Sequence, residues 1–165
     1  RADLRWNASL PNLGADSRYD TVEAEFESTW SRGKNSLQFG ALYATTVDSK
    51  DAIQDLFTLG GFLRLSGLER GEISGPHAAL TRLVYYRRVS DSTGGVFNVP
   101  VYLGASLEAG NTWNERGDIS LGSALINGGL FAGFDTPIGP VYLGAGLAED
   151  GRSNYYLFFG VPERR

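Results

Sequence analysis

The stretch VPVYLGASLEAGNT, residues 99–112, decides the fold because apolar and polar side chains alternate along it. One set of alternate positions is apolar: Val99, Val101, Leu103, Ala105, Leu107 and Ala109. The intervening set is polar or small: Tyr102, Gly104, Ser106, Glu108, Gly110 and Thr112. Successive side chains of a strand point to opposite faces, so the stretch predicts a β-strand with one apolar and one polar face. Its length exceeds the average globular strand of about 5 to 6 residues and suffices for a tilted strand across a bilayer, which needs about 9 to 11.

The same two-residue period extends over most of the chain, and no helical stripe of comparable length occurs. The six prolines all fall in connections or at strand ends, as the missing N–H of proline requires. We therefore predict an all-β, antiparallel fold. The nine expected strands lie near 3–10, 19–31, 36–46, 56–66, 78–89, 99–113, 122–135, 140–148 and 154–161.

The polar face of the second expected strand is strongly acidic. Glu23, Glu25 and Glu27 follow one another at alternate positions, opposite an apolar face that includes Phe26 and Trp30. A dry core would not accept three stacked carboxylates, so we expect them to be hydrated. A solvated wall is the simplest interpretation, and selection of ions or substrate along a path is the alternative.

Two architectures fit strands with one apolar and one polar face. A soluble sandwich buries the apolar face in its core, whereas a membrane barrel turns that face to lipid and the polar face to a wet lumen. Long strands, the Gly-rich and acidic polar face, and aromatic residues near strand ends favour the barrel; these aromatic residues are Tyr19, Trp30, Trp113, Tyr155 and Tyr156. The strand at 78–89 stays ambiguous, because TRLVYYRRV puts arginine on both faces.

Composition excludes several kinds of site. The 165 residues suffice for one domain; they contain 22 glycines, no cysteine, one histidine (His77) and no methionine. Cysteine-based zinc sites, disulfides and multi-histidine metal sites are therefore excluded, and we expect no cofactor. The net charge of −4 argues against a nucleic-acid partner. The missing methionine, even at position 1, leads us to expect a piece of a longer protein.

One segment resembles a known family. FTLGGFLRLSGL (57–68) resembles the sixth-loop region of the bacterial surface-antigen superfamily of outer-membrane barrels, in which a Gly-Gly pair is followed after four residues by Arg-Gly and an aromatic. Gly60, Gly61 and Gly67 keep the spacing, whereas Ser66 and Leu68 replace the arginine and the aromatic. This departure looks like the version in patatin-like phospholipases that carry their own C-terminal barrel.

Two later segments extend the resemblance over the whole chain. YLGASLEAGNTW (102–113) looks like the superfamily strand with an acidic residue, here Glu108, and GFDTPIGPVYLGAGLAEDGRSNYYLFFG (133–160) resembles its closing strands. The resemblance implies that residues 1–165 are the C-terminal part of a transmembrane barrel of about sixteen strands, whose N-terminal strands and patatin domain are missing. The implied location is the outer membrane of a Gram-negative bacterium, with membrane lipid and the barrel-assembly machinery as partners. The end VPERR departs from the terminal Phe that this machinery usually recognises during membrane assembly.

The implied function is that of an autotransporter-like anchor for protein secretion, which helps export and display an attached lipolytic domain. The alternatives are a general protein-translocating barrel without an enzyme and a soluble β-sandwich binding module. We expect no catalytic residues, because the patatin motif Gly-x-Ser-x-Gly is absent and Asp150-Gly151 is expected to form a turn. His77 is expected to be a solvated loop residue.

The resemblance also implies a loop that folds into the lumen at residues 64–72. Gly60 and Gly61 are expected to form a bulge or a close backbone approach. With Ser66 in place of the family arginine, we expect Arg70, or else Arg64, to pair with Glu108. The alternative is that Glu108 is an independent hydrated carboxylate.

Overall fold

A computed structural model describes residues 1–9, 19–49, 56–90, 99–137 and 139–160. These residues form ten strands and no α-helix. The strands are β1 (Ala2–Ser9), β2 (Tyr19–Arg32), β3 (Asn35–Ser49), β4 (Phe57–Leu59), β5 (Ile73–Gly75), β6 (His77–Ser90), β7 (Val101–Trp113), β8 (Leu125–Thr136), β9 (Gly139–Ala148) and β10 (Ser153–Phe159). The all-β antiparallel prediction is confirmed.

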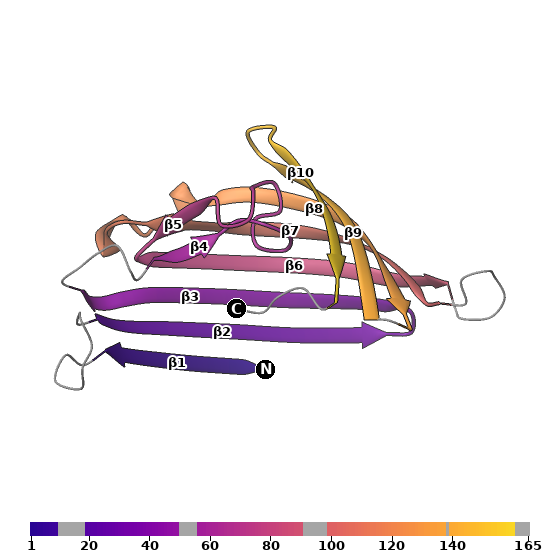
Figure 1. The fold of residues 1–165 in the computed structure, drawn as a ribbon, viewed down its shortest axis with the longest axis horizontal. Coiled ribbons are helices and arrows are strands. Elements are labelled where there is room, and N and C mark those ends of the chain that lie inside the picture. Colours follow the sequence, from indigo (N-terminus) through magenta and orange to yellow (C-terminus); the bar gives the residue numbers. More distant parts are fainter. Residues whose placement is uncertain (10–18, 50–55, 91–98, 138, 161–165) are drawn as a thin grey trace.

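Eight of these strands form one antiparallel sheet in the order β1-β2-β3-β6-β7-β8-β9-β10. The sheet curves without closing on itself, so β1 and β10 are its two edges (Figure 1). The short β4–β5 ribbon and the chain between its strands lie on the concave side, over β6 and β7 (Figure 1). All the described connections within the sheet join neighbouring strands, and the insertion of β4 and β5 between β3 and β6 is the one departure from a simple meander.

The convex face of the sheet is apolar. The predicted alternation holds along the long strands, and the register brings the apolar positions of adjacent strands into line. Charged side chains on this face of the described residues lie only toward strand ends, with Asp20 at one end of β2 and Arg32 and Arg87 toward the opposite end of the sheet. The large exposed apolar side chains of this face are Leu4, Trp6, Phe26, Trp30, Leu37, Tyr43, Leu83, Tyr85, Val89, Leu103, Leu107, Ile126, Leu130, Leu143, Leu147, Tyr155, Leu157 and Phe159.

The ambiguous strand now has a defined orientation. In β6, Leu83 and Tyr85 face outward in register with Leu107 and Ala105, whereas Arg82 faces the concave side in register with Glu108. Arg87 lies on the outward face, whereas Arg82 and Arg88 lie on the concave face, so β6 carries arginine on both faces.

The core lies between the concave face and the inserted segment. Leu59, Leu65 and Leu68 of this segment are fully buried, and they cluster with small and apolar residues of the sheet, namely Ala44, Ala78, Leu80 and Ala148. Burying three leucines stabilises the segment by several kcal/mol, at about 1.5 to 3 kcal/mol each before entropy is counted. The packed interior therefore lies on the concave face of the sheet, which is the face that carries the polar residues of the strands.

The expectation of a long strand at 56–66 is wrong. Only Phe57–Leu59 is a strand, and residues 60–72 form turns. Leu63 and Leu65 adopt positive φ angles of 60° and 75°. The alternation of apolar and polar residues from Leu63 to Ser66 therefore does not reflect an extended backbone. The apolar residues of this compact turn are spaced in the sequence like those of a strand, which is why a strand was predicted here.

The turn region after β7 covers one end of the convex face. It contains two single-turn 3₁₀ helices, η2 (Arg116–Asp118) and η3 (Leu121–Ser123). Trp113 is buried there and donates from Nε1 to Ser123, and buried His77 lies 2.7 Å from the Thr45 hydroxyl. The expectation of a solvated His77 is therefore wrong, because the adjacent turn region shields this end of the sheet.

The structure also corrects the aromatic positions. Trp30 and Tyr155 face outward and are exposed, whereas Tyr156 faces the concave side and Trp113 is buried. The side chain of Tyr19 lies outside the described residues. Across the described ranges, no helix has the length and apolar character needed to span a membrane.

Candidate functional site: the docked loop

The docked loop, residues 60–72, joins β4 to β5 on the concave side and contains six predicted site residues: Gly60, Gly61, Arg64, Ser66, Gly67 and Arg70. Gly60 and Gly61 adopt φ angles of 120° and 109°, which side-chain-bearing residues rarely adopt. A Cβ at Gly60 would also overlap the carbonyl oxygen of Glu69. The two glycines thus let the chain reverse direction at the start of the loop, which accords with the expected close backbone approach.

Ser66 attaches the docked loop to β7. Its backbone N–H donates to Oε2 of Glu108 at 2.6 Å, and its hydroxyl donates to Oε1 at 2.6 Å. The Ser106 hydroxyl donates to the same Oε1 at 2.5 Å. Ser66 and Glu108 are both fully buried, and these three hydrogen bonds compensate the loss of water around the carboxylate.

The expected pairing of Arg70 or Arg64 with Glu108 is wrong, because the carboxylate is bound by Ser66 and Ser106. The alternative of a hydrated Glu108 is wrong as well, because the residue is fully buried. Arg70 is exposed, and Arg64 reaches the Thr58 carbonyl oxygen at 3.4 Å. Ser66 reaches the carboxylate with two short donors, its backbone N–H and its hydroxyl. Ser66, which stands where the resemblance led us to expect an arginine, is itself the partner of Glu108.

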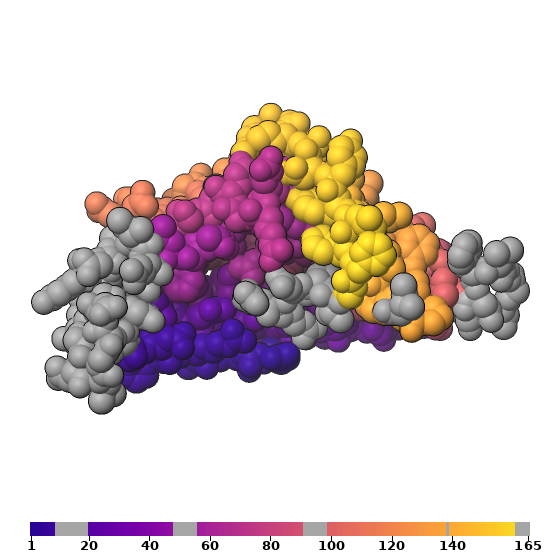
Figure 2. Space-filling view, viewed as in Figure 1, coloured from indigo at the N-terminus to yellow at the C-terminus, as the bar shows by residue number. Residues whose placement is uncertain are grey.

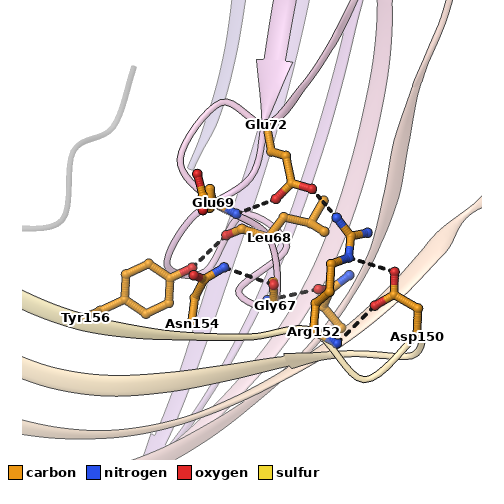
Figure 3. Close-up of polar contacts among 9 residues, drawn as sticks. Gly67, Leu68, Glu69, Glu72, Asp150, Arg152, Asn154 and Tyr156 are labelled. Atoms are coloured by element: carbon orange, nitrogen blue, oxygen red, sulfur yellow. Dashed lines mark hydrogen bonds and ion pairs between the residues drawn. The ribbon is translucent and has the colours of Figure 1, made fainter.

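Strands β8 and β10 hold the next residues of the docked loop. The Gly67 N–H donates to Asn127 Oδ1 at 2.9 Å, and Asn154 Nδ2 donates to the Gly67 carbonyl oxygen at 3.0 Å. The Tyr156 hydroxyl lies 2.8 Å from the carbonyl oxygens of both Ser66 and Leu68. Figure 3 shows Asn154 and Tyr156 reaching from β10 to the loop backbone. Side chains of β8 and β10 therefore form the hydrogen bonds to the loop backbone that a neighbouring strand would form in a sheet.

Small residues allow the docked loop to approach the sheet this closely. A Cβ at Gly67 would overlap the backbone nitrogen of Ala148, and a Cβ at Gly146 would overlap the carbonyl oxygen of Ser66. A Cβ at Gly129 would lie 3.3 Å from the Ser66 hydroxyl. The Gly-rich polar face is therefore a surface shaped for the loop backbone.

Phe62 anchors the start of the docked loop in an aromatic cluster. Its ring centroid lies 5.6 Å from that of Phe131 in an edge-to-face arrangement and 5.5 Å from that of Phe158. The Tyr156 ring lies 5.7 Å from Phe62 and stacks on Phe158. This cluster joins the loop to both β8 and β10, and the space-filling view shows the loop and β10 in contact (Figure 2).

An ion-pair network closes the far end of the docked loop. Arg152, in the turn after β9, pairs with Glu72 and also donates from Nε to Asp150 at 2.7 Å (Figure 3). The Arg152 backbone N–H and guanidinium hold the pKa of Asp150 below its usual value, and hydrogen bonding to Asp150 raises the pKa of Arg152. All three side chains reach solvent, so this network is weaker than the buried contacts.

Arg82 links the docked loop to the acidic strand. Its guanidinium donates to the Leu63 carbonyl oxygen at 3.3 Å and pairs with Glu27 at 3.2 Å, with both side chains largely buried. Burial, followed by the neighbouring Arg82 charge, lowers the pKa of Arg64, while Glu23 and Glu25 oppose this shift. The three glutamates lie on the concave face, where Glu27 has a specific cationic partner.

A cavity of about 490 Å³ lies beside the docked loop on the concave face. Glu25, Arg64, Arg82, Tyr86 and Tyr142 are among its lining residues. Within the described ranges, no three His, Asp or Glu side chains gather as the ligands of a metal ion would.

Five residues that hold the loop are not among the site residues predicted from the sequence: Phe62, Arg82, Asn127, Asn154 and Tyr156. Asn127 alternates with the apolar residues Ile126 and Leu130 and pairs with Glu108, and Tyr156 lies opposite Gly144, where a glycine leaves room for a large neighbour. Strand parity could therefore have assigned the side chains of Asn127 and Tyr156 to the concave face. It could not have shown that they bind the backbone of the loop.

No protein-family model matches the sequence, and no protein with a curated description matches it significantly.

Proposed function

We propose that this sheet is part of an outer-membrane β-barrel of the surface-antigen type, which anchors an attached domain and helps to export it. The observation that carries the proposal is the contrast between the two faces. The convex face exposes a broad apolar band with charges only toward strand ends, while the concave face binds a loop through buried polar groups. Lipid on the outside and a wet, partly filled lumen on the inside accommodate both faces.

A soluble sandwich is less compatible with this arrangement. Such a fold would need a second layer over the apolar face. In the described part of the chain, the β4–β5 ribbon lies instead on the concave face, and large side chains such as Leu107 and Leu130 remain more than half exposed. Monomeric soluble proteins rarely expose an apolar surface of this extent.

The docked loop suggests a lumen that is obstructed at rest. Its backbone is attached to β7, β8 and β10 by Glu108, Asn127, Asn154 and Tyr156, so it occupies space through which an exported chain would pass. Export through this lumen then requires either displacement of the loop or passage beside it. The cavity next to Arg82 and Glu25 marks the side where room remains.

The lipolytic nature of the attached domain is the part of the proposal that rests on sequence resemblance alone. It follows from Ser66 and Leu68 at the positions of the family arginine and aromatic. The sequence preceding Arg1 in the natural protein tests it: a Gly-x-Ser-x-Gly motif there supports a patatin domain, and an upstream region without an enzyme favours a general translocating barrel.

The membrane part of the proposal is tested by fractionating Gram-negative cells that express the full-length protein. We expect the protein in the outer-membrane fraction, resistant to extraction by salt or carbonate and soluble only in detergent. A protein recovered as a monomer in detergent-free buffer would overturn the proposal and favour the sandwich.

A further inference from the structure

The apolar band of the convex face ends in a row that contains two arginines. The pairing register places Arg32 of β2 opposite Asn35 of β3, and Asn35 opposite Arg87 of β6. All three residues are exposed. Neighbouring strands are about 4.8 Å apart, so the Cα atoms of Arg32 and Arg87 lie about 10 Å from each other on either side of Asn35.

This end of the convex face carries positive charge without a nearby carboxylate on the same face. The acidic positions that the register puts on the convex face of β2, β3 and β6 are Asp20 and its partner Asp48, both at the opposite end of these strands. Glu27 belongs to the concave face, where it pairs with Arg82. The local charge is therefore opposite in sign to the net charge of −4 of the chain.

The adjacent row toward mid-strand is aromatic and apolar. Trp30, Leu37 and Tyr85 are in register with one another, and their exposed fractions are 57%, 39% and 45%. The Tyr85 hydroxyl donates to Asn35 Oδ1 at 2.7 Å. This bond orients the Asn35 amide and leaves its NH₂ group to donate elsewhere, between the two arginines.

We propose that the row Arg32–Asn35–Arg87 binds the phosphate of an anionic membrane phospholipid, whose acyl chains lie on Trp30, Leu37 and Tyr85. Two guanidinium groups can each donate two hydrogen bonds to phosphate oxygens, and the Asn35 amide adds a neutral donor between them. An anionic headgroup is preferred to a zwitterionic one, because the ammonium of the latter is repelled by both arginines. The inference rests on the proposed membrane function and identifies the lipid class that one part of the barrel surface selects.

The test uses the full-length protein in lipid nanodiscs and the fluorescence of Trp30, obtained as the difference between the wild type and W30F. Nanodiscs contain a minority of brominated phosphatidylglycerol or of brominated phosphatidylcholine, since bromine quenches tryptophan on contact. We expect stronger quenching by the brominated anionic lipid, with a preference of about fivefold for each arginine at low salt. The preference should shrink as salt is raised.

The double variant R32Q/R87Q should quench equally with both lipids, whereas R5Q, which removes an exposed arginine from the concave face of β1, should keep the wild-type preference. Equal quenching by both lipids in the wild type, or loss of the preference in R5Q as well, would overturn the phosphate site and leave the membrane proposal intact. Absence of Trp30 quenching with either lipid would contradict the membrane proposal itself.

Discussion

Ser66 and Glu108 are joined by two hydrogen bonds that use both carboxylate oxygens, one from the Ser66 backbone N–H and one from its hydroxyl, each 2.6 Å long. The residues are 42 positions apart in the chain and both are fully buried. This pair connects the docked loop to the middle of the sheet. It explains how a chain with serine at this position can hold the loop without an arginine.

Replacing Ser66 by alanine removes the hydroxyl donor but keeps the backbone donor. Because the lost bond has a charged acceptor, we expect S66A to destabilise the docked loop by about 1.5 to 3 kcal/mol. Hydrogen exchange of the full-length protein in detergent should show faster exchange at Gly67 and Leu68. S74A, at an exposed serine of β5, should leave exchange at these amides unchanged. Equal behaviour of the two variants would contradict the role of Ser66.

The same contact can be measured as an interaction energy. A double-mutant cycle of S66A and E108Q should give a coupling of about 0.5 to 3 kcal/mol, because the two side chains touch. Additive effects would indicate that the loop is held elsewhere. A parallel cycle of R70Q and E108Q is expected to be additive, which separates the observed contact from the arginine pairing that the sequence suggested.

Gly146 is a second critical position, since a Cβ there would overlap the Ser66 carbonyl oxygen. We expect G146A to displace the docked loop and to destabilise the protein by about 1 to 3 kcal/mol, as overpacking does. G128A is the matched control, because a Cβ at Gly128 would meet one atom, the Ser106 carbonyl oxygen, at an ordinary 3.6 Å. Thermal unfolding in detergent should distinguish the two variants, and equal midpoints would argue against the close approach.

Arginine at an outward mid-strand position tests the lipid face. L107R or L143R should cost about 2 to 4 kcal/mol of folding free energy in the membrane. T29R, at an exposed concave-face position of β2, should cost less. Gly104 and Ser106 are unsuitable as inward controls, because a Cβ at Gly104 would overlap the Phe131 ring and Ser106 binds Glu108. Equal costs at outward and inward positions would show that the faces are wrongly assigned.

The turn after β9 should respond to acid. The pKa of Asp150 is lowered in the folded protein, mainly by the Arg152 backbone N–H and then by its guanidinium. Its contribution is therefore complete above the unfolded pKa of about 3.9 and is lost as the pH falls through the lower folded value. Exchange of the Arg152 amide, corrected for its intrinsic rate, should stay constant from pH 7 to 5 and rise below about pH 4. D150N should abolish this pH dependence, and a wild-type protein that lacks it would contradict the assignment.

The alternation of side chains predicted most of the sheet, because a face in contact with one environment imposes a two-residue period on the sequence. The expected strand at 99–113 corresponds to β7 (Val101–Trp113), and that at 140–148 to β9 (Gly139–Ala148). Leu103 and Glu108 lie on opposite faces as their positions require. The ends of the strands were predicted less exactly, because the sequence alone does not distinguish the last residue of a strand from the first residue of a turn.

The docked loop could be predicted only in part. Gly60 and Gly61 indicated an unusual backbone, but the positive φ angles of Leu63 and Leu65 depend on tertiary contacts that no local pattern reveals. The partner of Glu108 was misassigned because charge complementarity favoured an arginine, whereas the short distance favours a backbone N–H and a hydroxyl. Arg82 was ambiguous for a similar reason, since its role depends on a carbonyl oxygen of Leu63 brought close by the fold.

The central claim, that one face of the sheet meets lipid and the other meets water, is tested most directly by spin-label accessibility along β2 in the full-length protein. Single cysteines at positions 22–29, in a background without other reactive cysteines, would carry the label in lipid nanodiscs. We expect oxygen, which concentrates in lipid, to relax labels at 22, 24, 26 and 28, and a water-soluble nickel chelate to relax those at 23, 25, 27 and 29. Equal access of the nickel chelate to both sets would contradict the membrane-barrel account.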